Sequence, residues 1–179
     1  MKCVTFALTA ALLVACGIAF AEGGGTFTVK GKTTVLKSAY AYSRPDPFDQ
    51  SKQSTVIAFS ERLIDAKAID AAGDRMAALS HAMNDYLPDK ENRPASVEIM
   101  IARSDPQFPI QQIGFELPGR SSSASVGAEK FKLVLKRNDA KRIEGTLLST
   151  KEADKTAERG GYFDLHFALD VASSSADKK

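Results

Sequence analysis

The chain has 179 residues, of which 44% are apolar, 26% charged and 8% aromatic, and its formal net charge is +2. These proportions are typical of a folded globular protein and exclude an intrinsically disordered, collagen-like or disulfide-rich chain. The near balance of charges gives no indication of a basic nucleic-acid-binding protein, so nucleic acid is not expected among the partners.

The first 21 residues are expected to be a signal peptide. Lys2 supplies a basic start, residues 4–21 contain no charged side chain, and residues 19–21 (AFA) match the small-residue pattern that precedes a cleavage site. The alternative is a retained membrane anchor, because this uncharged stretch reaches the lower limit of about 17–25 residues for a membrane-spanning helix. Cleavage is favoured, which predicts an exported protein, periplasmic or secreted, whose mature chain has no transmembrane span.

A second cleavage site is open at Cys16. Residues 13–17 (LVACG) resemble a bacterial lipobox, in which the cysteine becomes lipidated and anchors the protein to a membrane. The chain stays apolar up to Glu22, whereas the tether of a lipoprotein is usually polar, so cleavage after Ala21 is preferred. Cys3 and Cys16 are the only cysteines, and the mature domain is therefore expected to lack disulfide bonds and thiolate ligands.

Alternating apolar and polar side chains predict β-strands along most of the mature chain. The expected strands cover residues 26–30, 33–42, 54–60, 96–101, 110–117, 130–135, 143–147 and 162–171. Turn residues separate them, as at Gly31-Lys32 and at residues 44–47 (RPDP). The last strand alternates most clearly, and its inward face carries Phe163, Leu165, Phe167, Leu169 and Val171.

Residues 65–87 have a helical period instead. Apolar residues recur at steps of three and four, which places one stripe on a helix that begins at Asp65 or Asp70 and ends before Pro88. The stripe consists of Ile69, Ala72, Met76, Leu79 and Met83. Gly73 lies within this helix and destabilises it by about 1 kcal/mol relative to alanine. His81 falls on the opposite face and is expected in solvent.

These elements predict a mainly β (α+β) protein with one domain over residues 22–171. Strands that follow one another as hairpins favour an antiparallel β-sandwich or a partly closed barrel of about eight strands with one packed helix. Residues 22–25 are expected to form a flexible lead-in, residues 119–127 and 151–161 loops, and residues 172–179 a disordered tail.

Two residues on the outward face of the last strand are weak candidates for a metal site. Asp164 and His166 lie two positions apart, and a carboxylate can orient an imidazole or join it at a metal ion. Zinc catalysis requires three protein ligands, and no H-x-E or H-E-x-x-H spacing occurs. A half-exposed polar pair is therefore preferred, and no cofactor is expected.

A basic cluster is the strongest candidate for a binding surface. It consists of Lys130, Lys132, Lys136, Arg137, Lys141 and Arg142. Such a cluster can hold phosphate groups of an envelope polymer or lipid. The preferred alternative is that lysines on an exposed strand prevent edge-to-edge pairing, because no aromatic side chains interleave the charges.

Other motifs have structural explanations. Residues 31–33 (GKT) lack the upstream glycine and the helix of a P-loop and are expected to form a hairpin turn. Residues 46–49 (DPFD) supply too few carboxylates for calcium and are expected to form a solvated turn. The serines of residues 121–125 lack a nucleophile-elbow pattern, so no catalytic serine is expected.

Export, a β-rich pattern and the lack of a catalytic constellation favour a non-catalytic binding, accessory or structural domain of the cell envelope. Its partner would be an envelope polymer, a lipid or another envelope protein. One alternative is a small metal-dependent hydrolase that uses His166 and Asp164. The other is a carrier that holds an apolar ligand between helix and sheet, near Tyr40, Tyr42 and Phe59.

Overall fold

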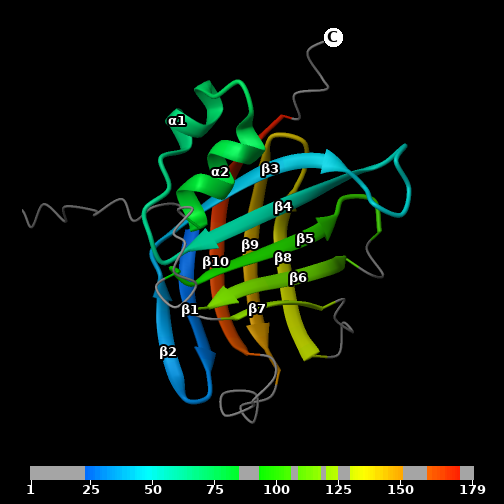
Figure 1. Cartoon of the computed structure of the whole chain (residues 1–179). Coiled ribbons are helices and arrows are strands. Elements are labelled where there is room, and N and C mark those ends of the chain that lie inside the picture. Colours follow the sequence, from blue (N-terminus) through cyan, green and yellow to red (C-terminus); the bar gives the residue numbers. More distant parts are fainter. Residues whose placement is uncertain are drawn as a thin grey trace, which may run out of the picture.

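The computed structural model describes residues 23–84, 93–105, 109–117, 120–124, 130–150 and 161–173, with only the backbone of residues 84 and 120–124. This part of the chain is mainly β, with ten strands and two helices (Figure 1). The strands are β1 (Gly23–Val29), β2 (Lys32–Leu36), β3 (Ser38–Pro45), β4 (Gln53–Ser60), β5 (Ser96–Ala102), β6 (Ile110–Leu117), β7 (Arg120–Ala124), β8 (Phe131–Asn138), β9 (Arg142–Ser149) and β10 (Tyr162–Ala172). The helices are α1 (Ala66–Ala71) and α2 (Arg75–Asn84).

The strands form one strongly curled sheet, which makes a half-barrel. Its order is β2-β1-β10-β3-β4-β5-β6-β7. In addition, β9 pairs with β10 on one side and with β8 on the other. In Figure 1, β3 to β6 run across the front of β1, β10, β9 and β8. The structure thus confirms the mainly β class and shows a curled half-barrel; it does not show a sandwich.

The sheet is mixed, whereas the sequence predicts an antiparallel one. β10 is antiparallel to β1 and β9, but at its end Val171 and Ala172 pair in parallel with Ala41 and Tyr42 of β3. Side-chain alternation shows which face of a strand is buried but not which way its neighbour runs, so it gave no signal of this pairing.

The main apolar core lies inside the curl and joins its two sides. The Phe27 ring stacks on the Phe163 ring at 4.7 Å between centroids and lies 5.1 Å from the Phe115 ring. The Phe59 and Phe167 rings meet edge to face at 6.3 Å. All five predicted inward residues of β10 are buried in this core, so the predicted phase of that strand is confirmed.

The two helices cover the outer face of β3, β4 and β5. Their buried residues Ile69, Leu79 and Met83 belong to a second apolar cluster with Tyr40, Tyr42, Val56, Ala58 and Met100. β4 therefore packs on both faces, which is why its sequence reads as one continuous apolar run.

A single helix over residues 65–87 is predicted, but the structure has two helices. The Asp65 carboxylate caps α1 by accepting from the Ala68 N–H at 3.1 Å, as predicted. A second carboxylate, that of Asp74, accepts from the Ala77 N–H at 3.0 Å and starts α2 after a break that contains Gly73. Leu79 and Met83 of the predicted stripe are buried in α2, whereas Met76 in its first turn is 49% exposed although it belongs to the same stripe.

Residues 23–25 are an ordered part of β1 and not a flexible lead-in. Gly25 has φ of 144°, and a Cβ there would lie 2.1 Å from the carbonyl oxygen of Asp164 in the neighbouring strand. A Cβ on Gly24 would lie 2.7 Å from the carbonyl oxygen of Leu36 on the other side. Glycine is required here because the backbones approach too closely for a side chain.

Two further segments differ from their predictions. The strand expected over residues 33–42 is divided at Lys37 into β2 and β3, so Leu36 faces the main core while Tyr40 faces the helices. Residues 120–124 form β7 within a predicted loop. The predicted signal peptide, with Cys16, and residues 151–160 and 174–179 lie outside the described residues.

Candidate functional site

The candidate site begins at the hairpin that joins β1 to β2. Lys30 and Gly31 have φ of 49° and 73°, which is the pattern of a type I′ turn and places the turn one residue earlier than predicted. Val29 pairs with Lys32 across this two-residue turn. The predicted hairpin at residues 31–33 is thus present, and the segment leads into a strand as expected.

β2 forms an edge of the described sheet, since it pairs with β1 on one side only. In a two-residue hairpin the pair that flanks the turn is hydrogen-bonded, and the pairs then alternate. Thr33 is therefore in a non-hydrogen-bonded pair with Thr28, and their Oγ1 atoms lie 2.8 Å apart. Val35 is in the next such pair, with Thr26. The backbone N–H and C=O groups of Thr33 and Val35 consequently point away from β1, toward the open edge.

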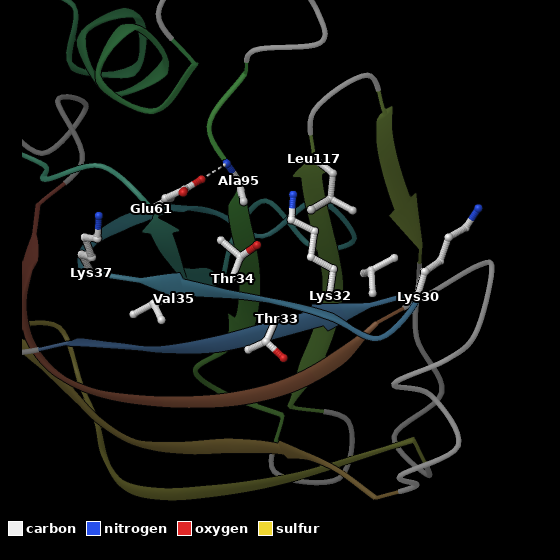
Figure 2. Close-up of a pocket in the computed structure, with 10 residues that line it drawn as sticks. Lys30, Lys32, Thr33, Thr34, Val35, Lys37, Glu61, Ala95 and Leu117 are labelled. Carbon is white, nitrogen blue, oxygen red and sulfur yellow. Dashed lines mark hydrogen bonds between the residues drawn. The ribbon is translucent and has the colours of Figure 1, made fainter.

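A cavity of about 610 Å³ lies along this edge (Figure 2). Its size is within the range of about 300–1,000 Å³ that is typical of ligand sites. It is lined by Val29, Lys30, Lys32, Thr33, Thr34, Val35, Lys37, Glu61, Ala95 and Leu117. Because residues from both faces of β2 line it, the cavity follows the edge of that strand.

The wall of the cavity opposite β2 lies where the end of β4 meets the start of β5, and two hydrogen bonds join these segments. The Glu61 carboxylate accepts from the Ala95 N–H at 3.1 Å, and the Glu61 N–H donates to the Ala95 carbonyl at 2.9 Å. Figure 2 shows Lys32 and Thr34 pointing from β2 toward Ala95 and Leu117. This arrangement places a lysine opposite an apolar wall.

The charge around the cavity is positive. Lys30, Lys32 and Lys37 contribute three positive charges, against one negative charge from Glu61. The Glu61 carboxylate already accepts a hydrogen bond from the wall. A bound group that carries negative charge would therefore be stabilised here, and more strongly at low ionic strength.

Asp164 and His166, the predicted metal candidates, are both exposed on the outer face of β10. Asp164 lies between Thr26 and Leu148 in the sheet register, and His166 lies next to Thr146. Among the described residues, no group of three His, Cys, Asp or Glu side chains is close enough to hold a metal ion.

The predicted basic cluster lies on β8, β9 and their turn, and three of its six members have acidic partners. Lys136 Nζ lies 3.4 Å from Glu144 Oε1, and Arg137 Nε lies 2.5 Å from Asp139 Oδ2. Arg142 Nη1 lies 2.9 Å from Asp170 Oδ1. Lys130, Lys132 and Lys141 are exposed. The Arg137 side chain and the backbone N–H groups of Lys141 and Arg142 lower the pKa of Asp139 to about 2. Arg137 thus stabilises the β8–β9 turn, whereas Lys136 and Arg142 pair with acidic residues on neighbouring strands.

Asp46 departs from the prediction of a solvated turn, because its side chain is 5% exposed. One carboxylate oxygen accepts from the Phe48 and Asp49 N–H groups at 2.8 and 3.1 Å. The other accepts from the Ser54 hydroxyl at 2.9 Å and from the Gln111 amide. Burial by itself raises the pKa of Asp46, but these hydrogen bonds outweigh it and hold the pKa below its ordinary value. The residue is a fixed internal acceptor that joins the loop to β4 and β6.

The residues proposed for an apolar ligand between helix and sheet do not share one site. Tyr40 and Tyr42 pack under the helices, whereas Phe59 faces the main core. The Tyr40 hydroxyl donates to the Asp70 carboxylate of α1 at 2.6 Å. Burial raises the pKa of Tyr40, and this hydrogen bond raises it further. Neither of the two described helices has the length and apolarity needed to cross a bilayer.

Sequence reasoning interpreted residues 31–33 only as a turn and missed the cavity beside them. The available signal was three lysines within eight residues, Lys30, Lys32 and Lys37, around a short strand. The opposite wall, at Glu61, Ala95 and Leu117, comes from distant parts of the chain, and no local pattern brings it to this edge. Comparison with protein-family models, curated proteins and solved structures finds no match to this chain.

Proposed function

We propose that this chain is an exported, non-catalytic binding module of the cell envelope and that the cavity beside β2 is its ligand site. The observation that carries the proposal is the cavity itself, which combines a suitable volume with an apolar wall and a rim of lysines. Export is supported by the signal-peptide pattern of residues 1–21.

The lining indicates a ligand with two chemical parts. Leu117 offers apolar contact, whereas Val29 and Ala95 are 8% and 1% exposed, and Lys32 can pair with an anionic group. A purely apolar molecule would leave the charged rim unused, and a small inorganic anion would leave the apolar wall exposed. An anionic ligand with an apolar portion uses both.

Titration calorimetry with decanoate as an anionic apolar probe tests this proposal. We expect decanoate to bind more tightly than the neutral amphiphile decyl glucoside, and Lys32→Glu to weaken decanoate binding about tenfold or more, since it reverses the charge at the rim. The matched control is Lys67→Glu in the exposed helix α1, which makes the same charge change away from the cavity. An equal loss in both variants, or no decanoate binding, would refute the proposal.

A further inference from the structure

We infer that the cavity takes an extended polypeptide segment with acidic and apolar side chains, which pairs with β2 as an additional strand. The inference rests on the proposed binding function and names the class of its ligand. It depends on the edge of β2, the opposite wall and the charge of the rim, taken in turn below.

The edge of β2 offers backbone groups that a polypeptide satisfies best. By the alternation of the hairpin, Thr33 and Val35 each direct an N–H and a C=O toward the cavity that they line. A fatty acid offers no donor to these carbonyls. An extended peptide pairs with all of these groups at the regular spacing of a ladder, as in other cases of strand addition to a sheet edge.

The dimensions of the site suit a short extended segment. β2 has five residues, which corresponds to a length of about 17 Å for a strand. On the inner side, the segment would meet Leu117 and Ala95 across the cavity. On the outer side, it would lie beside the Val35 side chain, which is 56% exposed although it is aliphatic. Side chains of an added strand alternate between its two faces, so apolar side chains would lie beside Val35 on the outer side and acidic side chains beside Lys32 on the inner side.

The charge of the rim distinguishes an acidic partner from a second copy of this chain. Edge-to-edge pairing of two β2 strands would bring two sets of Lys30, Lys32 and Lys37 together, and like charges on paired edges oppose association. The same lysines favour carboxylates on a different chain. The partner that fits is therefore an acidic polypeptide segment.

The test compares peptides that differ only in the features that the inference uses. We expect a capped octapeptide of alternating valine and glutamate to bind and to compete with decanoate. An analogue N-methylated at alternate residues, on the edge that would pair with β2, should bind about tenfold or more weakly, because it cannot complete the ladder. A valine–lysine peptide of the same length should not bind.

A protein variant gives a second and independent readout. Val35→Pro removes an N–H that faces the cavity and leaves the hydrogen-bonded pairs with β1 intact, as proline is tolerated at such edge positions. We expect this variant to bind the valine–glutamate peptide about tenfold or more weakly than Val35→Ala, which shortens the same side chain but keeps the N–H, with circular dichroism as the check of folding. The peptide comparison needs only the wild-type protein, so it decides the inference even if the variant fails to fold.

The outcomes separate the two proposals. Decanoate binding that is sensitive to Lys32→Glu, without binding of the valine–glutamate peptide, would overturn this inference and leave the binding module standing. Equal affinity for the peptide and its N-methylated analogue would exclude strand pairing. A dimer of the protein alone that Val35→Pro abolishes, measured by sedimentation, would show that a second copy occupies the edge.

Discussion

At the residue scale, Asp46 shows how a loop carboxylate is turned into an internal support. It is buried and accepts bonds from two backbone N–H groups of its own loop and from the side chains of Ser54 and Gln111. A buried acceptor with these partners stabilises the fold as long as it is ionised. Its pKa is held below the ordinary value, so it stays ionised at neutral pH.

Replacement of this residue tests that role. We expect Asp46→Asn to lower the free energy of unfolding at pH 7 by about 1–3 kcal/mol, because an amide donor would face the Gln111 amide in a buried position. The control is Asp164→Asn on the exposed face of β10, expected within about 0.5 kcal/mol of wild type. Urea denaturation of the three proteins measures the difference.

The lowered pKa of Asp46 also determines whether the stability contributed by this residue rises or falls with pH. The stabilisation is present above the unfolded pKa of about 3.9 and is lost as the pH falls through the lower folded pKa. The gap in stability between wild type and Asp46→Asn should therefore narrow below about pH 4. A gap that stayed constant down to pH 2 would show that the ionised carboxylate is not its source.

At the element scale, members of the apolar stripe predicted for the helical segment differ in burial within α2. Leu79 is 2% exposed and Met76 is 49% exposed, although both belong to the stripe predicted for one continuous helix. We expect Leu79→Asp to destabilise the protein by about 3 kcal/mol or more, since it buries an unpaired charge, and Met76→Asp to cost about 0.5 kcal/mol or less. Thermal unfolding checks both, and equal costs would contradict this difference in burial.

An element can be predicted from the sequence when the residues that stabilise it lie within the element itself, and not when they lie in distant parts of the chain. β10 and β4 are recognisable because alternation and apolar runs reflect the faces that each strand itself buries. The start of β1 at residues 23–25 cannot be recognised from the sequence, because glycine is required there by the close approach of two other segments of the chain. The cavity beside β2 is equally hidden, because Leu117 reaches it only after the sheet has curled.

At the scale of the whole molecule, the first and last strands are neighbours. β1 lies between β2 and β10, and β10 in turn pairs with β9 and touches β3. Of its core side chains, Phe163 stacks on Phe27 and Phe167 meets Phe59. The last strand therefore connects both sides of the half-barrel.

Removal of this strand should abolish the fold. We expect a chain that ends at residue 161 to show no cooperative thermal transition, because five inward side chains of the main core are lost together with the partner of β1. The control ends at Ser173 and removes only residues beyond β10, and it should unfold like wild type. Circular dichroism against temperature distinguishes the two, and a cooperative transition in the shorter chain would contradict this dependence.

The pairing of β1 with β10 also fixes when the protein can fold. A strand made at the start of synthesis has to wait for one made at the end, and contacts of such long sequence separation form slowly. Until β10 has been made, β1 lacks this partner and the main core lacks the side chains that β10 supplies. Under the proposed export, this delay would keep the polypeptide competent for passage and postpone its final shape until the C-terminal strand has crossed.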